Sequence, residues 1–161
     1  MKGQTEIVSF ILLFLISSIL VFSAAVWANN IFQSNVDANK ISAAESFINA
    51  LDSRIQSVAR FGGSNSLDFS IAGTLKLEEG IIEFSSPSSI ELPAEWIYLN
   101  KSAFSTIREK REGRNFRLQL FYNPEEIDLF TEGTRIVSVG TVTIEKNETI
   151  NGIVRIELKF E

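Results

Sequence analysis

Residues Ile7 to Ala28 form an unbroken run of 22 residues without a charged side chain, close to the start of the chain. A helix of this length spans about 33 Å, which is enough to cross a hydrocarbon core of about 30 Å. Fourteen of these residues are Ile, Leu, Val or Phe, and together they favour membrane insertion by roughly 4 to 8 kcal/mol. The run therefore predicts a helix that is surrounded by lipid or by other apolar helices.

Three interpretations of this run are open from the residues alone. A secretory signal has an apolar core of about 7 to 15 residues, which is shorter than this run, although Val26 and Ala28 would allow cleavage before Asn29. An ordinary signal anchor needs only the length and the apolar character. The third interpretation depends on the residues immediately before the run.

A lysine and a glycine precede the run, and Glu6 lies at its edge, in the segment Lys2-Gly3-Gln4-Thr5-Glu6. Over about the first 35 residues, this arrangement resembles archaeal type IV pilin-like proteins. The resemblance implies that a prepilin peptidase-type enzyme removes a basic leader, residues 1–3, between Gly3 and Gln4. It also implies that the apolar segment stays in the mature chain, with Glu6 as its third residue, whereas many members of the family carry serine and glutamate at positions three and five.

Glu6 has two possible roles at the edge of the apolar run. A carboxylate beside hydrocarbon is costly unless it is paired. A newly formed α-amine about 4 Å away, in the same chain or a neighbouring subunit, would offset that cost by up to roughly 4 kcal/mol at an effective dielectric constant of 20. The alternative is a carboxylate that is solvated among the lipid headgroups.

The composition argues against several functional classes. The chain has 15 Lys and Arg against 20 Asp and Glu, a net charge of −5, which discourages binding to nucleic acid. It contains no cysteine and no histidine, so it lacks thiolate nucleophiles, disulfides, the commonest metal ligand and the usual neutral-pH base. We therefore expect a protein that is not an enzyme and that has no cofactor and no metal site.

A second helical pattern follows the apolar run. Apolar residues are spaced three or four apart along one face of the predicted helix, and the charged residues lie off this stripe. Gly62 and Gly63 are expected to end the helix, with Arg60 in its last turn. The stripe either covers a sheet or packs against neighbouring subunits, and it consists of Ile41, Ala44, Ile48, Leu51, Ile55 and Val58.

The remainder of the chain has the composition of β-structure. Short segments rich in β-branched and aromatic residues are separated by Gly, Ser, Pro and Asn. This predicts an α+β fold in which a long N-terminal helix packs on a mainly antiparallel sheet, either a β-sandwich or a single curled sheet. Seven strands are predicted, over residues 67–72, 74–77, 80–84, 96–99, 116–122, 135–144 and 153–160.

Asn151-Gly152 predicts a two-residue hairpin turn, because both positions of a type I′ turn need positive φ. The simplest register pairs Glu148 with Arg155 and Lys146 with Glu157, but it also places Asn147 on the buried face. A bulge, a turn at residues 145–148, or a silent glycosylation sequon would each resolve this conflict.

Four polar segments are candidates for binding or modification. Asn100 and Asn147 begin N-glycosylation sequons, which would suit an external location. Residues 108–114 mix basic and acidic side chains, and we expect a solvated turn rather than an anion or surface-layer contact. Glu125, Glu126 and Asp128 lack the spacing of an EF-hand, so calcium binding is not expected there.

These observations predict four segments: the leader over 1–3, a transmembrane or filament-core helix over 4–35, an amphipathic helix over 36–61 and an extracytoplasmic β-domain over 62–161.

The resemblance implies a structural subunit of a surface filament. The chain would polymerise with itself or other pilin-like subunits through its apolar helix, with an assembly ATPase and a platform protein acting indirectly. The alternative is a single-pass membrane anchor, a minor or stator-like protein whose β-domain contacts the cell-surface layer. Within the apolar helix, the residues expected to face lipid or neighbouring helices include Ile7, Phe10, Phe14 and Phe22.

Overall fold

The computed structural model describes the backbone of residues 2–90, 93–131 and 135–161, and the side chains of residues 7–90, 93–131 and 138–161. The chain divides into two compact units, Met1–Val36 and Asp37–Glu161. Helix α1 (Lys2–Phe61) makes up the described part of the first unit and provides the first element of the second. The second unit, called the C-terminal unit below, contains all the strands.

The C-terminal unit is an α+β fold, as predicted from the sequence. All eight strands of its described residues join in one sheet, with the order β3-β4-β5-β2-β1-β7-β8-β6, rather than in two separate sheets. Neighbouring strands are antiparallel except for β6 and β8, which are parallel. The strands are β1 (Ser64–Glu78), β2 (Ile81–Pro87), β3 (Ile97–Lys101), β4 (Ser105–Glu112), β5 (Asn115–Tyr122), β6 (Ile127–Thr131), β7 (Arg135–Ile150) and β8 (Ile153–Phe160).

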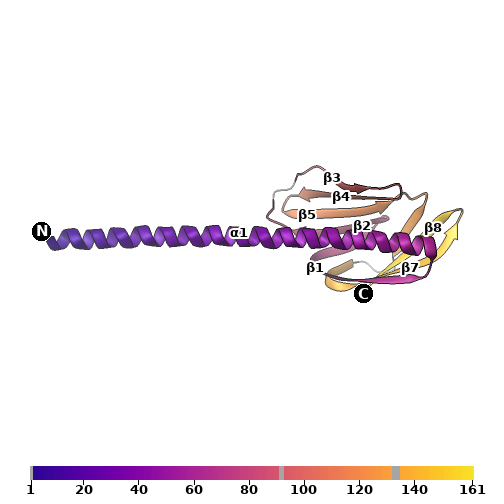
Figure 1. Ribbon diagram of the computed structural model, residues 1–161, viewed down its shortest axis with the longest axis horizontal. Coiled ribbons are helices and arrows are strands. Elements are labelled where there is room, and N and C mark those ends of the chain that lie inside the picture. Colours follow the sequence, from indigo (N-terminus) through magenta and orange to yellow (C-terminus); the bar gives the residue numbers. More distant parts are fainter. Residues whose placement is uncertain (1, 91–92, 132–134) are drawn as a thin grey trace. The chain divides into compact units, whose positions relative to one another are not determined.

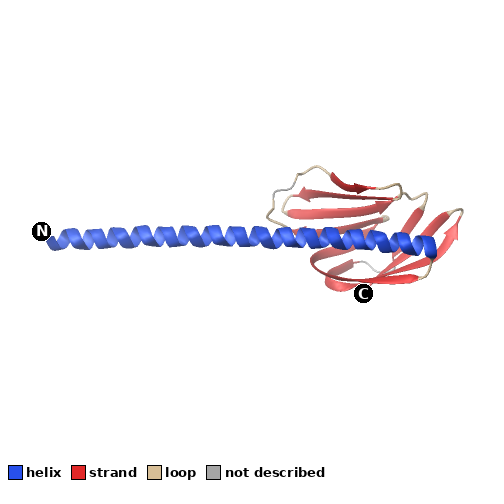
Figure 2. Ribbon diagram, viewed as in Figure 1, coloured by secondary structure: helices blue, strands red, loops and turns tan. Residues whose placement is uncertain are grey.

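The second half of α1 lies across the middle of this sheet. In Figure 1, β3, β4 and β5 lie on one side of the helix, and β1 and β7 lie on the other. Figure 2 shows the helix lying against the sheet in this unit. The sheet therefore has an inner face, which contacts α1, and an outer face, which does not.

The predicted apolar stripe forms the helix side of the core. All six of its residues are buried, and Phe47 and two aspartates are buried on the same side of the helix. The first of the two interpretations, that the stripe covers a sheet, is therefore confirmed for this unit. The helix ends as predicted: the Gly62 amide donates to the Val58 carbonyl at 2.8 Å, and Gly62 has a φ of +74°.

Aromatic rings connect the helix to the centre of the sheet. Phe47 of α1 meets Phe69 of β1 edge to face, with ring centroids 5.1 Å apart, and the contacts continue to Phe84 and Phe116 at 6.0 and 6.3 Å. Such pairs contribute about 0.5–1.5 kcal/mol each beyond the area that they bury. Three of the rings, Phe69, Phe84 and Phe116, are about 1 % exposed, so this row lies in the interior of the core.

Two strands differ from the sequence prediction. The segment over residues 108–114, predicted as a solvated turn, is instead mostly strand β4, and only Gly113 and Arg114 form the turn to β5. Strand β6, which begins at Ile127, was not predicted at all. Only two of the eight residues of β4, Thr106 and Ile107, are β-branched and five are charged, so its composition does not indicate a strand. Strand β6 has only five residues and closely follows Asn123 and Pro124, which are typical of a turn.

Strand β1 is continuous through Gly73, where two short strands were predicted. A register shift between Ser70 and Thr74 marks a bulge against β7. A Cβ atom at Gly73 would lie 2.7 Å from the Ser85 carbonyl oxygen and 2.5 Å from the Phe84 ring, so only glycine fits there. The glycine therefore permits a close approach of the neighbouring strand instead of ending its own.

The predicted hairpin at Asn151-Gly152 is present, with φ values of +52° and +87°. Glu148 pairs with Arg155 as expected, and their side chains form an ion pair at 3.0 Å. The predicted pairing of Lys146 with Glu157 is wrong, because a register shift between Lys146 and Glu148 places Lys146 opposite Ile156. This bulge resolves the conflict at Asn147, which is exposed.

Candidate functional site

The apolar part of α1 is the most unusual surface of the molecule. Every large apolar side chain between Ile7 and Phe22 is 51–76 % exposed, including the four named above: Ile7, Phe10, Phe14 and Phe22. These residues occupy consecutive positions such as 10–16 and therefore surround the helix on all sides. A helix that is apolar all round needs an apolar environment all round.

This helix has the length and composition of a membrane span. Its most apolar 18-residue stretch has a mean hydropathy of 2.7, and no part of that stretch is buried by the described residues. A single apolar helix near the start of a chain is weak evidence by itself, since a signal sequence passes the same test. The exposure of the side chains shows only that something apolar must cover them. Lipid and neighbouring helices would both meet this need.

The leader residues Gly3, Gln4 and Glu6 lie within α1, but their side chains lie outside the described residues. The cleavage between Gly3 and Gln4 and the pairing of Glu6 with an α-amine therefore stay predictions.

Asp37 begins the C-terminal unit and joins the helix to the segment after β2. Its Oδ2 accepts hydrogen bonds of 2.6 Å from both the backbone N–H and the hydroxyl of Ser89. Lys40 donates to Asp37 Oδ1 at 3.1 Å and to the Pro87 carbonyl at 2.9 Å. These bonds from Ser89, followed by the contact with Lys40, lower the pKa of the Asp37 carboxyl.

Asp52 makes a second polar contact between the helix and the sheet. The Tyr122 hydroxyl of β5 donates to its Oδ1 at 2.6 Å, and the Gln56 amide donates to both oxygens at 3.0 Å. Burial, together with the Asp52 charge, raises the pKa of Tyr122 far above its ordinary value. Each of these polar side chains has a hydrogen-bond partner. We therefore interpret the group as a structural contact that fixes the position of the helix on the sheet.

Glu109 of β4 faces α1 in a very different setting. It is 7 % exposed, and its Oε2 has no hydrogen-bond partner. Burial first, and then the charge and hydrogen bond of Glu45 from the helix, raise the pKa of the Glu109 carboxyl. Arg111, two residues along the same strand, does not neutralise it, because its guanidinium donates to the Gly113 and Ile90 carbonyls.

The raised pKa predicts how stability depends on pH. The folded state holds the Glu109 proton to a higher pH than the unfolded state, so this group costs stability as pH rises above the unfolded value of 4.5. We expect Glu109→Gln to stabilise the C-terminal unit by about 1–3 kcal/mol near neutral pH, because its amide can donate to Glu45 at every pH. Urea unfolding between about pH 5 and pH 8 measures this.

Unfolding is followed by Trp96 fluorescence in the full chain in detergent micelles. The variant Trp27→Phe serves as background, because the chain has two tryptophans. Glu95→Gln, at an exposed loop position, is the matched control. The assignment fails if Glu109→Gln is no more stable than this control near neutral pH, or if both lose stability equally with rising pH.

The outer face of the sheet carries a polar and aromatic row across β2, β5 and β4. The Gln119 amide donates to Glu83 at 2.8 Å and its oxygen accepts two bonds from Arg108, at 3.0 and 2.8 Å. The Arg108 guanidinium lies 4.3 Å from the Trp96 ring centroid and 4.9 Å from that of Phe121. These contacts hold the Arg108 side chain on the outer face of the sheet. The expectation that residues 108–114 do not contact an anion or a surface layer stays a prediction.

The two sequons and Glu125 are at the surface, whereas Glu126 and Asp128 are half-buried. Asn100 of β3 and Asn147 of β7 are exposed, so either could carry a glycan. Asp128 pairs with Arg155 at 3.1 Å. Among the described residues, no three His, Cys, Asp or Glu side chains gather in a group that could hold a metal ion.

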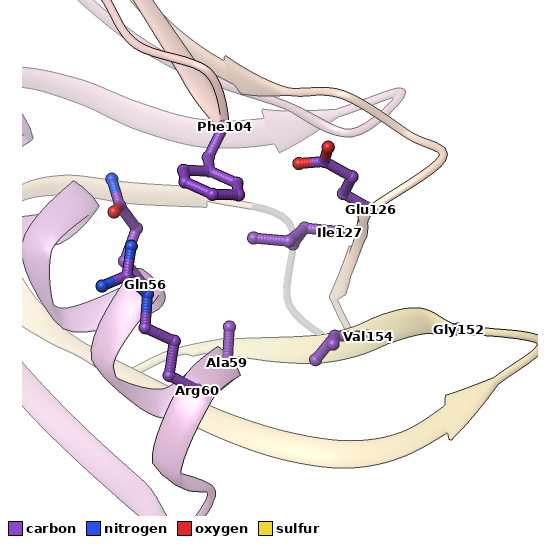
Figure 3. A pocket seen from close by; sticks show the side chains of 8 residues that line it. All are labelled: Gln56, Ala59, Arg60, Phe104, Glu126, Ile127, Gly152 and Val154. Atoms are coloured by element: carbon purple, nitrogen blue, oxygen red, sulfur yellow. The ribbon is translucent and has the colours of Figure 1, made fainter.

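A pocket of about 240 Å³ opens at the C-terminal end of α1 (Figure 3). Three loops and the last turns of the helix form its walls: the β3–β4 turn, the β5–β6 turn and the β7–β8 hairpin. The sequence showed no sign of this pocket, because its residues are far apart in the chain. It is lined by Gln56, Ala59, Arg60, Phe104, Glu126, Ile127, Gly152 and Val154.

No family model, no curated protein and no solved structure matches this chain.

Proposed function

We propose that this protein is a structural subunit of an archaeal type IV pilus-like surface filament, which polymerises through the apolar part of α1. The observation that carries the proposal is the exposure of every large apolar side chain from Ile7 to Phe22. The resemblance of the leader segment to pilin-like proteins supports it. Such a subunit is structural and acts on no substrate.

The physical basis is the exchange of one apolar environment for another. Before assembly, lipid would cover the helix, and in the filament the same helix of neighbouring subunits would cover it. Lipid tails are about as apolar as leucine, so the transfer is decided by packing between helices rather than by a large hydrophobic term. An assembly ATPase and a platform protein would drive the extraction.

The C-terminal unit suits the outward part of such a subunit. It has its own core, and its stripe is already covered by the sheet, so it needs no neighbour to bury its apolar residues. We infer that the contacts between subunits are made mainly by the first unit. Because all six residues of the stripe are buried within this unit, contacts of the helix with neighbouring subunits would be limited to positions before Ile41.

The second candidate is a membrane-anchored minor pilin-like or stator-like protein, whose β-domain contacts the cell-surface layer. The same exposed helix supports it, because lipid covers an apolar helix as well as neighbouring helices do. In this case the helix never leaves the bilayer.

Shearing whole cells distinguishes the two candidates. A filament subunit is expected in the sheared extracellular fibres, with a mature chain that begins at Gln4 by mass spectrometry. Recovery only in washed membranes would contradict the filament and leave the anchor. A soluble form that begins at Asn29 would contradict both, because the apolar helix would then be a cleaved signal.

A further inference from the structure

The pocket at the C-terminal end of α1 contains two opposite charges that do not pair with each other. In Figure 3 the Phe104 ring lies between Arg60 and Glu126. The Arg60 guanidinium lies 5.5 Å from the centroid of this ring. Among the described residues, neither Arg60 nor Glu126 takes part in an ion pair.

Of these two side chains, Glu126 is the one with a buried polar atom that lacks a hydrogen-bond partner. Its backbone is fixed, since its N–H donates to the Asn123 carbonyl and its carbonyl accepts from Val154. Its side-chain Oε2 is shielded from water and accepts no hydrogen bond. A buried carboxylate oxygen without a donor costs free energy. Glu126 also lines the pocket, so a group that brings an N–H or O–H to its carboxylate from the pocket would offset part of this cost.

The remaining walls are apolar and the space is small. Ala59, Ile127 and Val154 offer aliphatic surface, and Phe104 offers a half-exposed ring. Pockets for drug-sized ligands measure about 300–1,000 Å³, whereas this one measures about 240 Å³. It therefore suits a single ring or a single side chain.

We propose that this pocket binds one neutral sugar ring. Each hydroxyl of a sugar both donates and accepts, so one ring can donate to Glu126 and accept from Arg60 at the same time. The C–H groups of the ring can rest on the apolar walls and on the Phe104 face, whose π-electrons are negative. A ligand with a net charge would be attracted by one of the two groups and repelled by the other.

The proposal does not depend on whether the chain polymerises, because the pocket lies wholly within the C-terminal unit. A terminal sugar of a surface glycan and a free monosaccharide have the same chemistry here. A methyl glycoside represents the first source, because its anomeric oxygen is linked, and the reducing sugar represents the second.

The test uses the full chain in a detergent that has no sugar headgroup. Methyl glycosides and free forms of glucose, galactose, mannose and N-acetylglucosamine are titrated by saturation-transfer NMR. We expect at least one of these sugars to bind. Phe104→Ala and Glu126→Gln are each expected to weaken that binding by about tenfold, the loss of one ring contact or one charged acceptor.

Two neighbouring residues provide matched controls. Phe61 is 85 % exposed and Glu125 is exposed, and neither lines the pocket. Phe61→Ala and Glu125→Gln should bind like the wild type, and thermal unfolding shows whether each variant is folded. The proposal is overturned if no sugar of the panel binds. It is also overturned if pocket and control variants bind equally, or if a peptide with an aromatic or lysine side chain displaces the sugar and binds more tightly.

Discussion

Replacing Leu51 by alanine is expected to destabilise the C-terminal unit by about 2–5 kcal/mol. Leu51 lies in the middle of the helical stripe and is fully buried against the sheet. Truncation removes the transfer free energy of the side chain and leaves a cavity, because a helix held on both sides by polar contacts at Asp37 and Asp52 cannot move inward to close it. Urea unfolding with Trp96 fluorescence, in the Trp27→Phe background, measures the loss.

The matched control for this prediction is Phe61→Ala at the end of the same helix. Phe61 is a larger apolar residue but is 85 % exposed, so its removal should change stability by less than about 0.5 kcal/mol. Equal losses in the two variants would contradict the assignment of the stripe as the helix side of the core.

The second large effect is expected from two arginines in the apolar part of α1. Leu13→Arg combined with Leu20→Arg should cost insertion about 6–8 kcal/mol, since each swap removes a favourable leucine and adds a charge. The whole apolar run favours insertion by roughly 4–8 kcal/mol on the same scale. The two terms nearly cancel, so the double variant should be lost from washed membranes and from sheared fibres alike.

Ser53→Arg with Ser57→Arg provides the control for added charge. Both serines are exposed on the second half of the helix. This variant should insert and assemble as the wild type does. Normal membrane recovery of the Leu13 and Leu20 double variant would show that the apolar helix does not hold the protein in an apolar environment, and it would remove both candidate functions.

The accuracy of the sequence prediction differed between elements, for physical reasons. The helical stripe and the Gly62 end were predicted correctly because they depend on local spacing and backbone conformation. The strand over β4 was missed because charged residues dominate its sequence. One of these charges, Arg108, is accommodated because it lines up with Gln119 and Glu83 across three neighbouring strands. The registers of those strands are set by the rest of the sheet.

The strand register of the last hairpin was also predicted only in part from the sequence. The turn at Asn151-Gly152 follows from two residues that accept positive φ. The bulge at Asn147 does not follow from the turn, because it lies just beyond Glu145, where the pairing of β7 with β1 ends and the pairing set by the hairpin turn begins. A strand with two neighbours must pair in register with both of them. The sequence of one hairpin carries information about only one of these two pairings.

By itself, the sequence determined that the chain has a 22-residue apolar segment in need of apolar surroundings, followed by a helix with one apolar face and a set of strands. These are properties of neighbouring residues, which the chain carries before it folds. Only the tertiary structure decided that the eight strands of the described residues form one sheet, that Glu109 is buried beside Glu45, and that Arg60, Phe104 and Glu126 meet in one pocket. Such contacts join residues that are far apart in the chain, so they exist only once the sheet has placed its loops at the end of the helix.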